Sequence, residues 1–233
     1  MIDIHTHVLP EMDDGSKSTA ETDAMLSALW QQGVTQVVAT PHFYPTQDTL
    51  AGFLQRRARA FKKMPPANPE HPQVLLGAEI SYFPGIGTCE GLPLLNIQGT
   101  KLLLIEMPFS PWSERMVNEI CSIPNCFGLR PVLAHVNRYY HSRQLPAFMD
   151  DFFAAGVYFQ CNTDAFLTAK HRRWALKMMK KGNITFLGSD CHNMDTRPPH
   201  VDAARTLIVK KLGADRYARF QQTAKDLFDL EKI

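Results

Sequence analysis

The chain alternates between short hydrophobic runs and longer amphipathic segments. Seven runs have the length and apolar content of β-strands, and they cover residues 1–7, 34–40, 73–80, 101–107, 131–136, 157–162 and 184–189. A continuous apolar run such as Leu-Leu-Leu-Ile at 102–105 is typical of parallel strands that are buried on both faces. The pattern therefore predicts an α/β protein built on a parallel sheet.

Most of the predicted strands are followed by a segment with helical periodicity. We expect helices at about 19–32, 49–63, 113–122, 143–155, 168–181, 201–212 and 215–227. Gly33 and Gly182 follow two of them at the position that favours glycine after a helix. Strand–helix alternation leaves two architectures open, a closed barrel and a doubly wound sheet. An α/β barrel of 233 residues is ordinarily a single domain.

Residue types that bind metals recur at the carboxyl ends of the predicted strands. His5 and His7 point to the same face of the first strand, because side chains alternate along a strand. Glu79 and Glu106 end apolar runs, where a buried carboxylate is costly unless it is paired or bound to metal. In a parallel barrel the carboxyl ends of the strands gather on one face, where active sites are built. The candidate ligands are His5, His7, Asp14, His42, Glu79, Glu106, His135, Asp190 and His192.

Two details of this set stay open or depend on local conformation. Asp13 and Asp14 precede Gly15 in a turn, and the spacing does not decide which of the two is the ligand. An extended chain at residues 190–192 directs Asp190 and His192 to the centre and Cys191 away from it. The set is imidazole and carboxylate without thiolate, which favours Mn, Fe or Zn in a hydrolytic role over a structural zinc. It has too many ligands for one ion, so we expect two or three ions.

Composition narrows the class of partner and the compartment. The formal net charge of +2 gives no reason to expect nucleic acid or a membrane surface as a partner. No apolar run approaches the ~20 residues of a membrane span, so we expect no membrane insertion. The five cysteines are scattered and odd in number, which favours free thiols in a reducing cytoplasm. The histidine motif opens the chain, so we expect no signal peptide.

Taken together, these motifs resemble the polymerase-and-histidinol-phosphatase (PHP) superfamily. The similarity is greatest to one branch, the manganese-dependent tyrosine phosphatases of bacterial capsule and exopolysaccharide loci (the CpsB/YwqE type). It lies in the amino-acid sequence of residues 1–7, 13–18, 77–80, 134–139, 189–193 and 197–200. The resemblance implies a distorted, TIM-like (β/α)7 barrel, with residues 1–233 as one domain that holds three metals. It also implies hydrolysis of a phosphotyrosine protein, such as the tyrosine-rich tail of a bacterial tyrosine kinase.

The resemblance also implies a role for each candidate residue. One metal would take His5, His7, Glu79 and Asp190; a second would take Asp14, His42 and His192; a third would take Glu79, Glu106 and His135. Mn²⁺ is the expected ion, and metals of this kind activate a bound water at neutral pH. Arg138 and Arg197 follow two ligand-bearing strands and are expected to hold phosphoryl oxygens bidentately. Asn137 and Pro41 depart from the usual family pattern without removing a ligand.

Four other interpretations compete with this hypothesis. The interval from Cys191 to Arg197 has the C-x5-R spacing of thiol-based tyrosine phosphatases, although it lacks the glycine that such phosphate loops carry. A metal-dependent amidohydrolase shares the His-x-His motif but usually has a carbamylated lysine, and no lysine ends a core strand here. A PHP-type phosphatase of small molecules is the third. A catalytically inactive regulatory scaffold is the fourth, and the complete ligand set argues against it.

Overall fold

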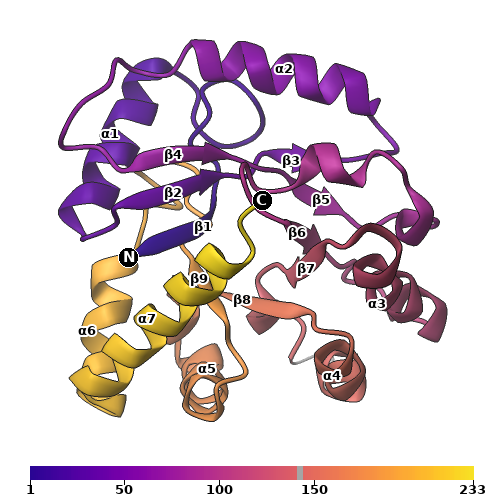
Figure 1. Cartoon of the computed structure of the whole chain (residues 1–233). Helices are drawn as coiled ribbons and strands as arrows, with labels where there is room; N and C mark the ends of the chain where they lie inside the picture. Colours follow the sequence, from indigo (N-terminus) through magenta and orange to yellow (C-terminus); the bar gives the residue numbers. More distant parts are fainter. Residues whose placement is uncertain (141–143) are drawn as a thin grey trace.

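The strands form a curled parallel sheet with the helices packed around its outside (Figure 1). The computed structural model describes residues 1–140 and 144–233. Every pairing between the strands of this part of the chain is parallel. A parallel bridge between Thr6 and Cys191 brings the last strand position back to the first. The architecture is therefore the distorted (β/α)7 barrel, and the doubly wound sheet is excluded.

The described residues contain nine strands at seven positions of the barrel. They are β1 (Ile2–Thr6), β2 (Gln36–Ala39), β3 (His42–Phe43), β4 (Gln73–Leu76), β5 (Glu79–Ser81), β6 (Leu102–Glu106), β7 (Arg130–Leu133), β8 (Tyr158–Asn162) and β9 (Phe186–Gly188). The order is β1-β2-β4 in a three-stranded sheet and β3-β5-β6-β7-β8-β9 in a six-stranded sheet.

The prediction of single strands at 34–40 and 73–80 is wrong, because each run is broken in two. The first breaks at Thr40 and Pro41, where proline has no N–H to donate to a ladder. The second breaks at Gly77, whose missing side chain lets Val38 approach so closely that a Cβ would lie 3.0 Å from its Cγ1. Both breaks pass the chain from the smaller sheet to the larger one, and His42 and Glu79 come directly after them.

Seven α-helices occur in the described residues: α1 (Thr19–Gln31), α2 (Leu50–Lys62), α3 (Glu114–Phe127), α4 (Gln144–Ala154), α5 (Ala169–Lys181), α6 (Val201–Leu212) and α7 (Ala214–Leu230). The predicted helix start at residue 143 lies outside the described residues. The helix α3 runs past its predicted end because Ile123 continues the buried face of Val117 and Ile120. Between β5 and β6, two 3-10 turns, Ile86–Thr88 and Leu92–Leu95, replace an α-helix.

None of the described helices has both the length and the apolar character needed to cross a membrane.

Alternation along β6 separates the interior of the barrel from its outer layer. Leu102 and Leu104 pack in one buried cluster with Val132 and Phe186. Leu103 and Ile105 instead join the outer cluster, where the strands meet the helices. The same alternation carries Glu106 to the interior side at the carboxyl end of the strand. The helix α7 crosses the opposite, amino end of the barrel (Figure 1), and its Phe228 joins the interior cluster.

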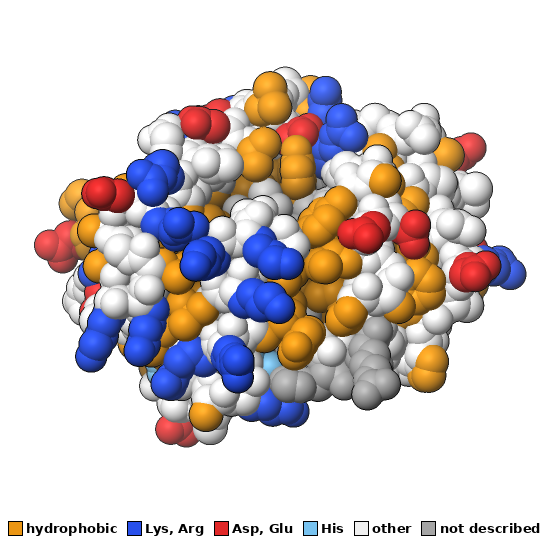
Figure 2. Space-filling model, turned by 90° about the horizontal axis from the view of Figure 1, so that it is seen from below, with side chains coloured by type: hydrophobic (Ala, Val, Ile, Leu, Met, Phe, Trp, Pro, Cys, Tyr) orange, Lys and Arg blue, Asp and Glu red, His pale blue; other side chains and the backbone are white. Residues whose placement is uncertain are grey.

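Charge is distributed unevenly over the molecule. Seen from below, Lys and Arg side chains gather over α5 and α6, next to a strip of hydrophobic side chains on the side of α4 (Figure 2). The surface is therefore locally basic although the net charge of the sequence is near neutral.

Candidate metal centre

Four ligand-type atoms converge where β1, β5 and the turn after β9 meet. His5 Nε2 and His7 Nε2 lie 3.2 Å apart. Glu79 Oε2 lies 3.1 Å from the first nitrogen and 3.3 Å from the second, and Asp190 Oδ1 lies 3.6 Å from each. All four residues are buried. The structure thus brings together the residues that the sequence analysis assigned to one metal.

A second group lies beside the first, at the mouth of the barrel. Asp14 Oδ1 is 3.4 Å from His42 Nε2 and 3.4 Å from His192 Nε2. The rings of His7 and His192 are stacked with centroids 3.8 Å apart. Ligand atoms of His7, Asp14, His42 and His192 all lie within 4.8 Å of one another. His7 therefore borders both groups.

The third group centres on Glu79. Its Oε1 lies 2.9 Å from His135 Nε2, which is 3.1 Å from Glu106 Oε1. Its Oε2 lies 3.0 Å from His42 Nδ1. Ligand atoms of His42, Glu79 and Glu106 also fall within 4.8 Å of one another. Glu79 thus contacts members of all three groups, as a bridging carboxylate must.

The two aspartates of the first loop have different surroundings. Asp13 Oδ2 lies 2.7 Å from His7 Nδ1, on the side of the ring away from the first group, and accepts a hydrogen bond from the backbone N–H of His42. Asp13 Oδ1 accepts one from the N–H of Gly15. Asp14 faces the imidazoles of the second group instead. The geometry favours Asp14 as a ligand and gives Asp13 the task of orienting His7, as carboxylates behind metal-bound histidines commonly do.

Several buried atoms of the site lie close to other ligand atoms without forming a hydrogen bond of acceptable geometry within the described residues. These atoms include Glu79 Oε2, His42 Nδ1 and His192 Nε2. A buried polar atom without a well-formed hydrogen bond costs free energy, and a cation between such atoms would supply the missing interaction. Nitrogen and oxygen donors without sulfur suit Mn, Fe or Zn. The residues present therefore fit bound metal ions.

Electrostatics keep the carboxylates of this cluster ionised. Burial acts to raise the pKa values of Glu79 and Asp190, but the neighbouring histidines outweigh it and lower both. Burial alone would lower the pKa of His7, yet Asp13 and Glu79 raise it to about 10. Burial and the nearby His7 lower the pKa of His192 to about 4. Ionised carboxylates among imidazoles form a site that attracts cations.

Two ligand-bearing turns have a left-handed backbone. The prediction that His135 lies on a strand is wrong, because β7 ends at Leu133 and His135 has a φ of 33°. The chain at 190–192 is not extended as expected, because Asp190 has a φ of 54°, but Asp190 and His192 still face the ligand groups and Cys191 lies in an apolar cluster. Non-glycine residues adopt this conformation rarely, and such strain concentrates at functional sites. Hydrogen bonds hold both turns: Asp190 N donates to His5 O at 2.8 Å, and His135 N donates to Gln160 Oε1 at 2.6 Å.

Both candidate arginines converge on Asp190. Arg138 Nη2 lies 2.5 Å from its Oδ2, and Arg197 Nη2 lies 2.9 Å from its Oδ1. Arg197 Nη1 also lies 3.8 Å from Asp14 Oδ2. The two side chains are 33% and 38% exposed, and both line an open hollow of about 280 Å³ beside the metal groups. They therefore have one side on the ligand cluster and the other on space that a substrate could enter.

Three further polar side chains support the site and were missed in the sequence. Asn162 Nδ2 donates to Asp190 Oδ2 at 2.8 Å, and Gln160 Oε1 lies 3.2 Å from His5 Nδ1. Asp3 Oδ1 accepts from the N–H groups of Ser189 and His5. Burial raises the pKa of Asp3 to about 6. The available signal was alternation: Gln160-x-Asn162 ends a strand as His5-x-His7 does, and Asp3 stands two residues before His5.

A family model described as "Capsular polysaccharide synthesis, CpsB/CapC" matches residues 1–227. The chain belongs to the CpsB/CapC family. It is 31% identical over 243 residues to the tyrosine-protein phosphatase CpsB of Streptococcus pneumoniae, covering 98% of this chain and 95% of that protein. The family resemblance drawn from the sequence motifs is therefore confirmed.

Solved structures agree with this membership. A crystal structure of YwqE from Bacillus subtilis and CpsB from Streptococcus pneumoniae, described as unique metal-dependent tyrosine phosphatases, superposes with a TM-score of 0.80 at 26% identity and covers 100% of this chain and 96% of that chain. A histidinol phosphate phosphatase from Lactococcus lactis superposes with a TM-score of 0.52 at 14% identity, covering 90% of this chain and 92% of that one. This second likeness concerns the fold alone.

The thiol hypothesis is wrong for this CpsB/CapC family member. Cys191 is fully buried in an apolar cluster with Val8, Leu9 and Ala39. Burial and the nearby Asp3 raise the pKa of the thiol well above its usual range. A nucleophilic cysteine needs the opposite, a lowered pKa and access to substrate. The C-x5-R spacing is therefore coincidental.

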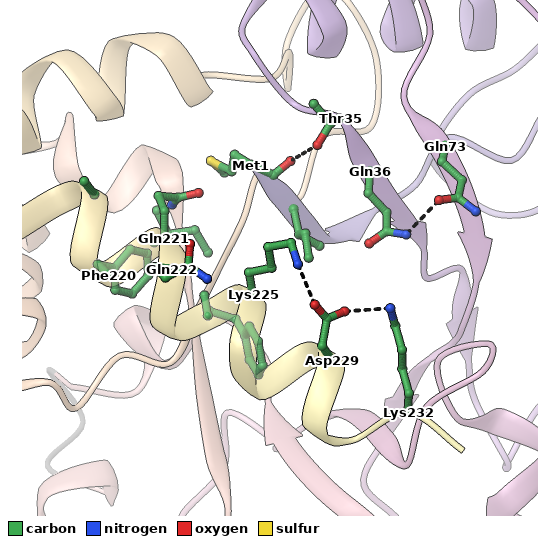
Figure 3. Close-up of a pocket in the computed structure, with 15 residues that line it drawn as sticks. Met1, Thr35, Gln36, Gln73, Phe220, Gln221, Gln222, Lys225, Asp229 and Lys232 are labelled. Carbon is green, nitrogen blue, oxygen red and sulfur yellow. Dashed lines mark hydrogen bonds and ion pairs between the residues drawn. The ribbon is translucent and has the colours of Figure 1, made fainter.

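A second hollow, of about 580 Å³, lies at the amino end of the barrel of this family member (Figure 3). It is bounded by the starts of β1, β2 and β4 and by α7. Lys225 and Lys232 both pair with Asp229 at 2.6 Å, and Gln36 donates to Gln73 at 3.0 Å. The two lysines share this one carboxylate, so each already has an ion-pair partner at the hollow. The hollow is also at the opposite end from the carboxyl ends of the strands, where the metal groups lie.

Proposed function

We propose that this chain is a metal-dependent protein-tyrosine phosphatase, with residues 1–233 as one PHP-type phosphatase domain. The observation that carries the proposal is the convergence of nine imidazole and carboxylate side chains beneath two partly exposed arginines. Phosphate-ester hydrolysis needs this combination of an activated water and charge neutralisation on the phosphoryl oxygens. The names of the family relatives support the same activity.

The position of each ligand residue indicates which ion it would bind. His5, His7, Glu79 and Asp190 would hold one ion, Asp14, His42 and His192 a second, and Glu79, Glu106 and His135 a third. When bound, such ions supply hydroxide at neutral pH and neutralise phosphoryl charge. Asp13 and Gln160 orient His7 and His5 through the ring nitrogens that face away from the ligand cluster.

The arginines hold the substrate phosphate. Arg138 engages Asp190 through Nη2, and a guanidinium has five N–H donors in a planar fork, so donors remain for two phosphoryl oxygens. Arg197 approaches the same carboxylate from its other oxygen. A tyrosine leaving group has an ordinary pKa of about 10, which makes it a better leaving group than an aliphatic alcohol. No covalent enzyme intermediate is required.

The finer assignments belong to the same proposal. The imidazole and carboxylate donors suit Mn, Fe or Zn, and the resemblance to manganese-dependent phosphatases makes Mn²⁺ the expected ion. The substrate is a phosphotyrosine protein, with the tyrosine-rich tail of a bacterial tyrosine kinase as the expected partner, and the process is capsule or exopolysaccharide synthesis. The five free cysteines support a cytoplasmic location, since cytosolic thiols are kept reduced.

Metal analysis combined with substrate comparison tests the proposal. We expect phosphotyrosine peptide hydrolysis to vanish after EDTA treatment and to return best with Mn²⁺, with two or three ions per chain by elemental analysis. Full activity in metal-free protein would overturn the metal mechanism. Faster turnover of histidinol phosphate or another small ester would favour the small-molecule phosphatase. Metal-loaded protein without turnover of any ester would favour the inactive scaffold.

A further inference from the structure

A groove of about 470 Å³ lies between α4 and α5, on the basic face shown in Figure 2. We refer to it as the α4–α5 groove. Apolar side chains form its floor, and three of them are recessed: Leu145 is 1% exposed, Met178 6% and Trp174 7%. Lys and Arg side chains of α5 form one wall. The groove therefore combines an apolar floor with a cationic edge.

The cationic edge is a regular stripe along α5. Lys170, Arg173, Lys177 and Lys181 are spaced by three or four residues, which puts them on one side of a helix. They line the groove together, and its lining contains no carboxylate. Within the described part of the chain, none of the four takes part in an ion pair with an acidic side chain. Like charges at this spacing repel, so an anionic partner in the groove would be attracted strongly.

The groove starts close to the metal centre. Tyr140 lines it and is two residues from Arg138, whose guanidinium contacts Asp190. Thr168 lines the hollow beside the metal groups, and Lys170 of the same segment lines the groove. Two residues span at most ~7 Å of chain. A polypeptide that leaves the hollow therefore reaches the groove within a few of its own residues.

We propose that the α4–α5 groove binds an acidic, tyrosine-bearing segment of the substrate polypeptide that flanks the phosphotyrosine held in the metal centre. This inference rests on the proposed phosphatase function. Carboxylates of the segment pair with the lysines and Arg173, and a tyrosine ring packs on Tyr140 and Trp174. Those two rings lie 5.1 Å apart at an interplanar angle of 31°, which extends an aromatic surface along the groove.

The concave shape of the α4–α5 groove favours a peptide over a membrane as its binding partner. A helix or patch that binds a lipid surface projects its apolar side chains into the bilayer and leaves its cations at the headgroups. Here Trp174 and Met178 are recessed below the cations, where a flat lipid surface cannot contact them. A peptide side chain can enter a concave site, so the apolar floor is used only in that case.

Charge reversal along the groove tests the proposal. The variant is Lys177→Glu with Lys181→Glu, and the matched control is Lys210→Glu with Lys211→Glu, which changes the net charge equally in the last turn of α6. The probe is the acidic copolymer poly(Glu,Tyr), unphosphorylated for binding and phosphorylated for kinetics. We expect the groove variant to bind the copolymer about tenfold more weakly and to raise KM for its phosphorylated form about tenfold. The control should change both by less than twofold.

Turnover of p-nitrophenyl phosphate, which is too small to reach the groove, should be the same in all three proteins. If the charge-reversed protein folds poorly, Lys177→Gln with Lys181→Gln provides a milder test with the same expected direction. Equal losses in the groove and control variants would mean that net charge alone attracts the substrate and would overturn the proposal. The proposal would also be overturned if the groove variant lost binding to phosphatidylserine vesicles while its kinetics with the copolymer stayed unchanged. The groove would then bind a lipid surface. Absence of p-nitrophenyl phosphate turnover in the wild type would instead refute the phosphatase function.

Discussion

Each histidine of the first ligand group is fixed through the ring nitrogen that faces away from the other ligands. His7 is held by Asp13 at 2.7 Å, and His5 faces Gln160 at 3.2 Å. Such partners set the orientation and tautomer of a ligand before an ion binds. The histidines themselves could be predicted from their spacing. Gln160 could not be predicted as the partner of His5, because the two residues are 155 residues apart and only the closed barrel brings them together.

The side chain of Arg138 provides a test at this scale. Replacement by Ala should lower turnover of a phosphotyrosine peptide by about 10²–10³, because donors aimed at developing phosphoryl charge are worth a few kcal/mol. Arg138→Lys should recover only part of the loss, since an ammonium cannot bridge two oxygens. Steady-state kinetics with elemental analysis of each variant measures this. Wild-type turnover in Arg138→Ala, or loss of bound metal along with activity, would contradict the assigned role.

At the scale of elements, the positions of the helices agreed with their periodicity better than the strands did with theirs. The helix α6 begins and ends at the predicted residues, and Ser18 caps α1, with its hydroxyl accepting from Glu21 N. Hydrophobicity alone predicted 34–40 and 73–80 as unbroken strands because the apolar runs continue through the breaks. The breaks occur at Pro41 and Gly77, and the change from one sheet to the other that follows each break depends on neighbouring strands, which a single segment does not encode.

The strand β9 contains a glycine on which the ligand geometry depends. A Cβ at Gly188 would lie 2.6 Å from His5 Cβ and 2.7 Å from Gln160 Nε2. Gly188→Ala should therefore destabilise the fold by about 1–3 kcal/mol through overpacking and displace His5 enough to reduce bound metal. Urea unfolding and elemental analysis measure the two effects.

Gly182→Ala is the matched control for this strand. Gly182 has a φ of 78° and open space around it, so alanine there costs about 1–2 kcal/mol of backbone strain far from the ligands. Its metal content should equal that of the wild type. Full metal occupancy in Gly188→Ala would show that β9 tolerates the added methyl group and that close packing against His5 is not required.

At the scale of the whole molecule, alternation of strands and helices predicted an α/β protein but left a closed barrel and a doubly wound sheet open, and the family resemblance implied the barrel. The strand ends predicted the face on which the candidate ligands lie. The α4–α5 groove was not predictable in this way. The stripe on α5 was visible in the sequence, but an exposed cationic helix face is usually only solvated. Whether the stripe borders a binding groove depends on the packing of α5 against α4, which creates the apolar floor.

Metal binding should also stabilise the whole barrel. An ion that binds only the folded chain adds about 2.7 kcal/mol at a free concentration of 100 times Kd. For a protein of this size we expect Mn²⁺ to raise the Tm of chelated protein by about 5–10 °C. Differential scanning calorimetry during a Mn²⁺ titration measures the shift. The Glu79→Gln variant, which loses the bridging carboxylate, should show a smaller shift, and identical Tm values for chelated and loaded wild type would argue against native metal sites.

The junction between β1 and β9 has a consequence for synthesis on the ribosome. His7 N donates to Cys191 O at 2.9 Å, and Ser189 N donates to Asp3 Oδ1 across 186 residues of chain. Contacts of such long sequence separation form late, because loop closure must come first. A nascent chain that has emerged only as far as β8 therefore exposes His5 and His7 without Asp190 or His192. Maturation of the metal centre is thus confined to the last stage of translation or to the period after release.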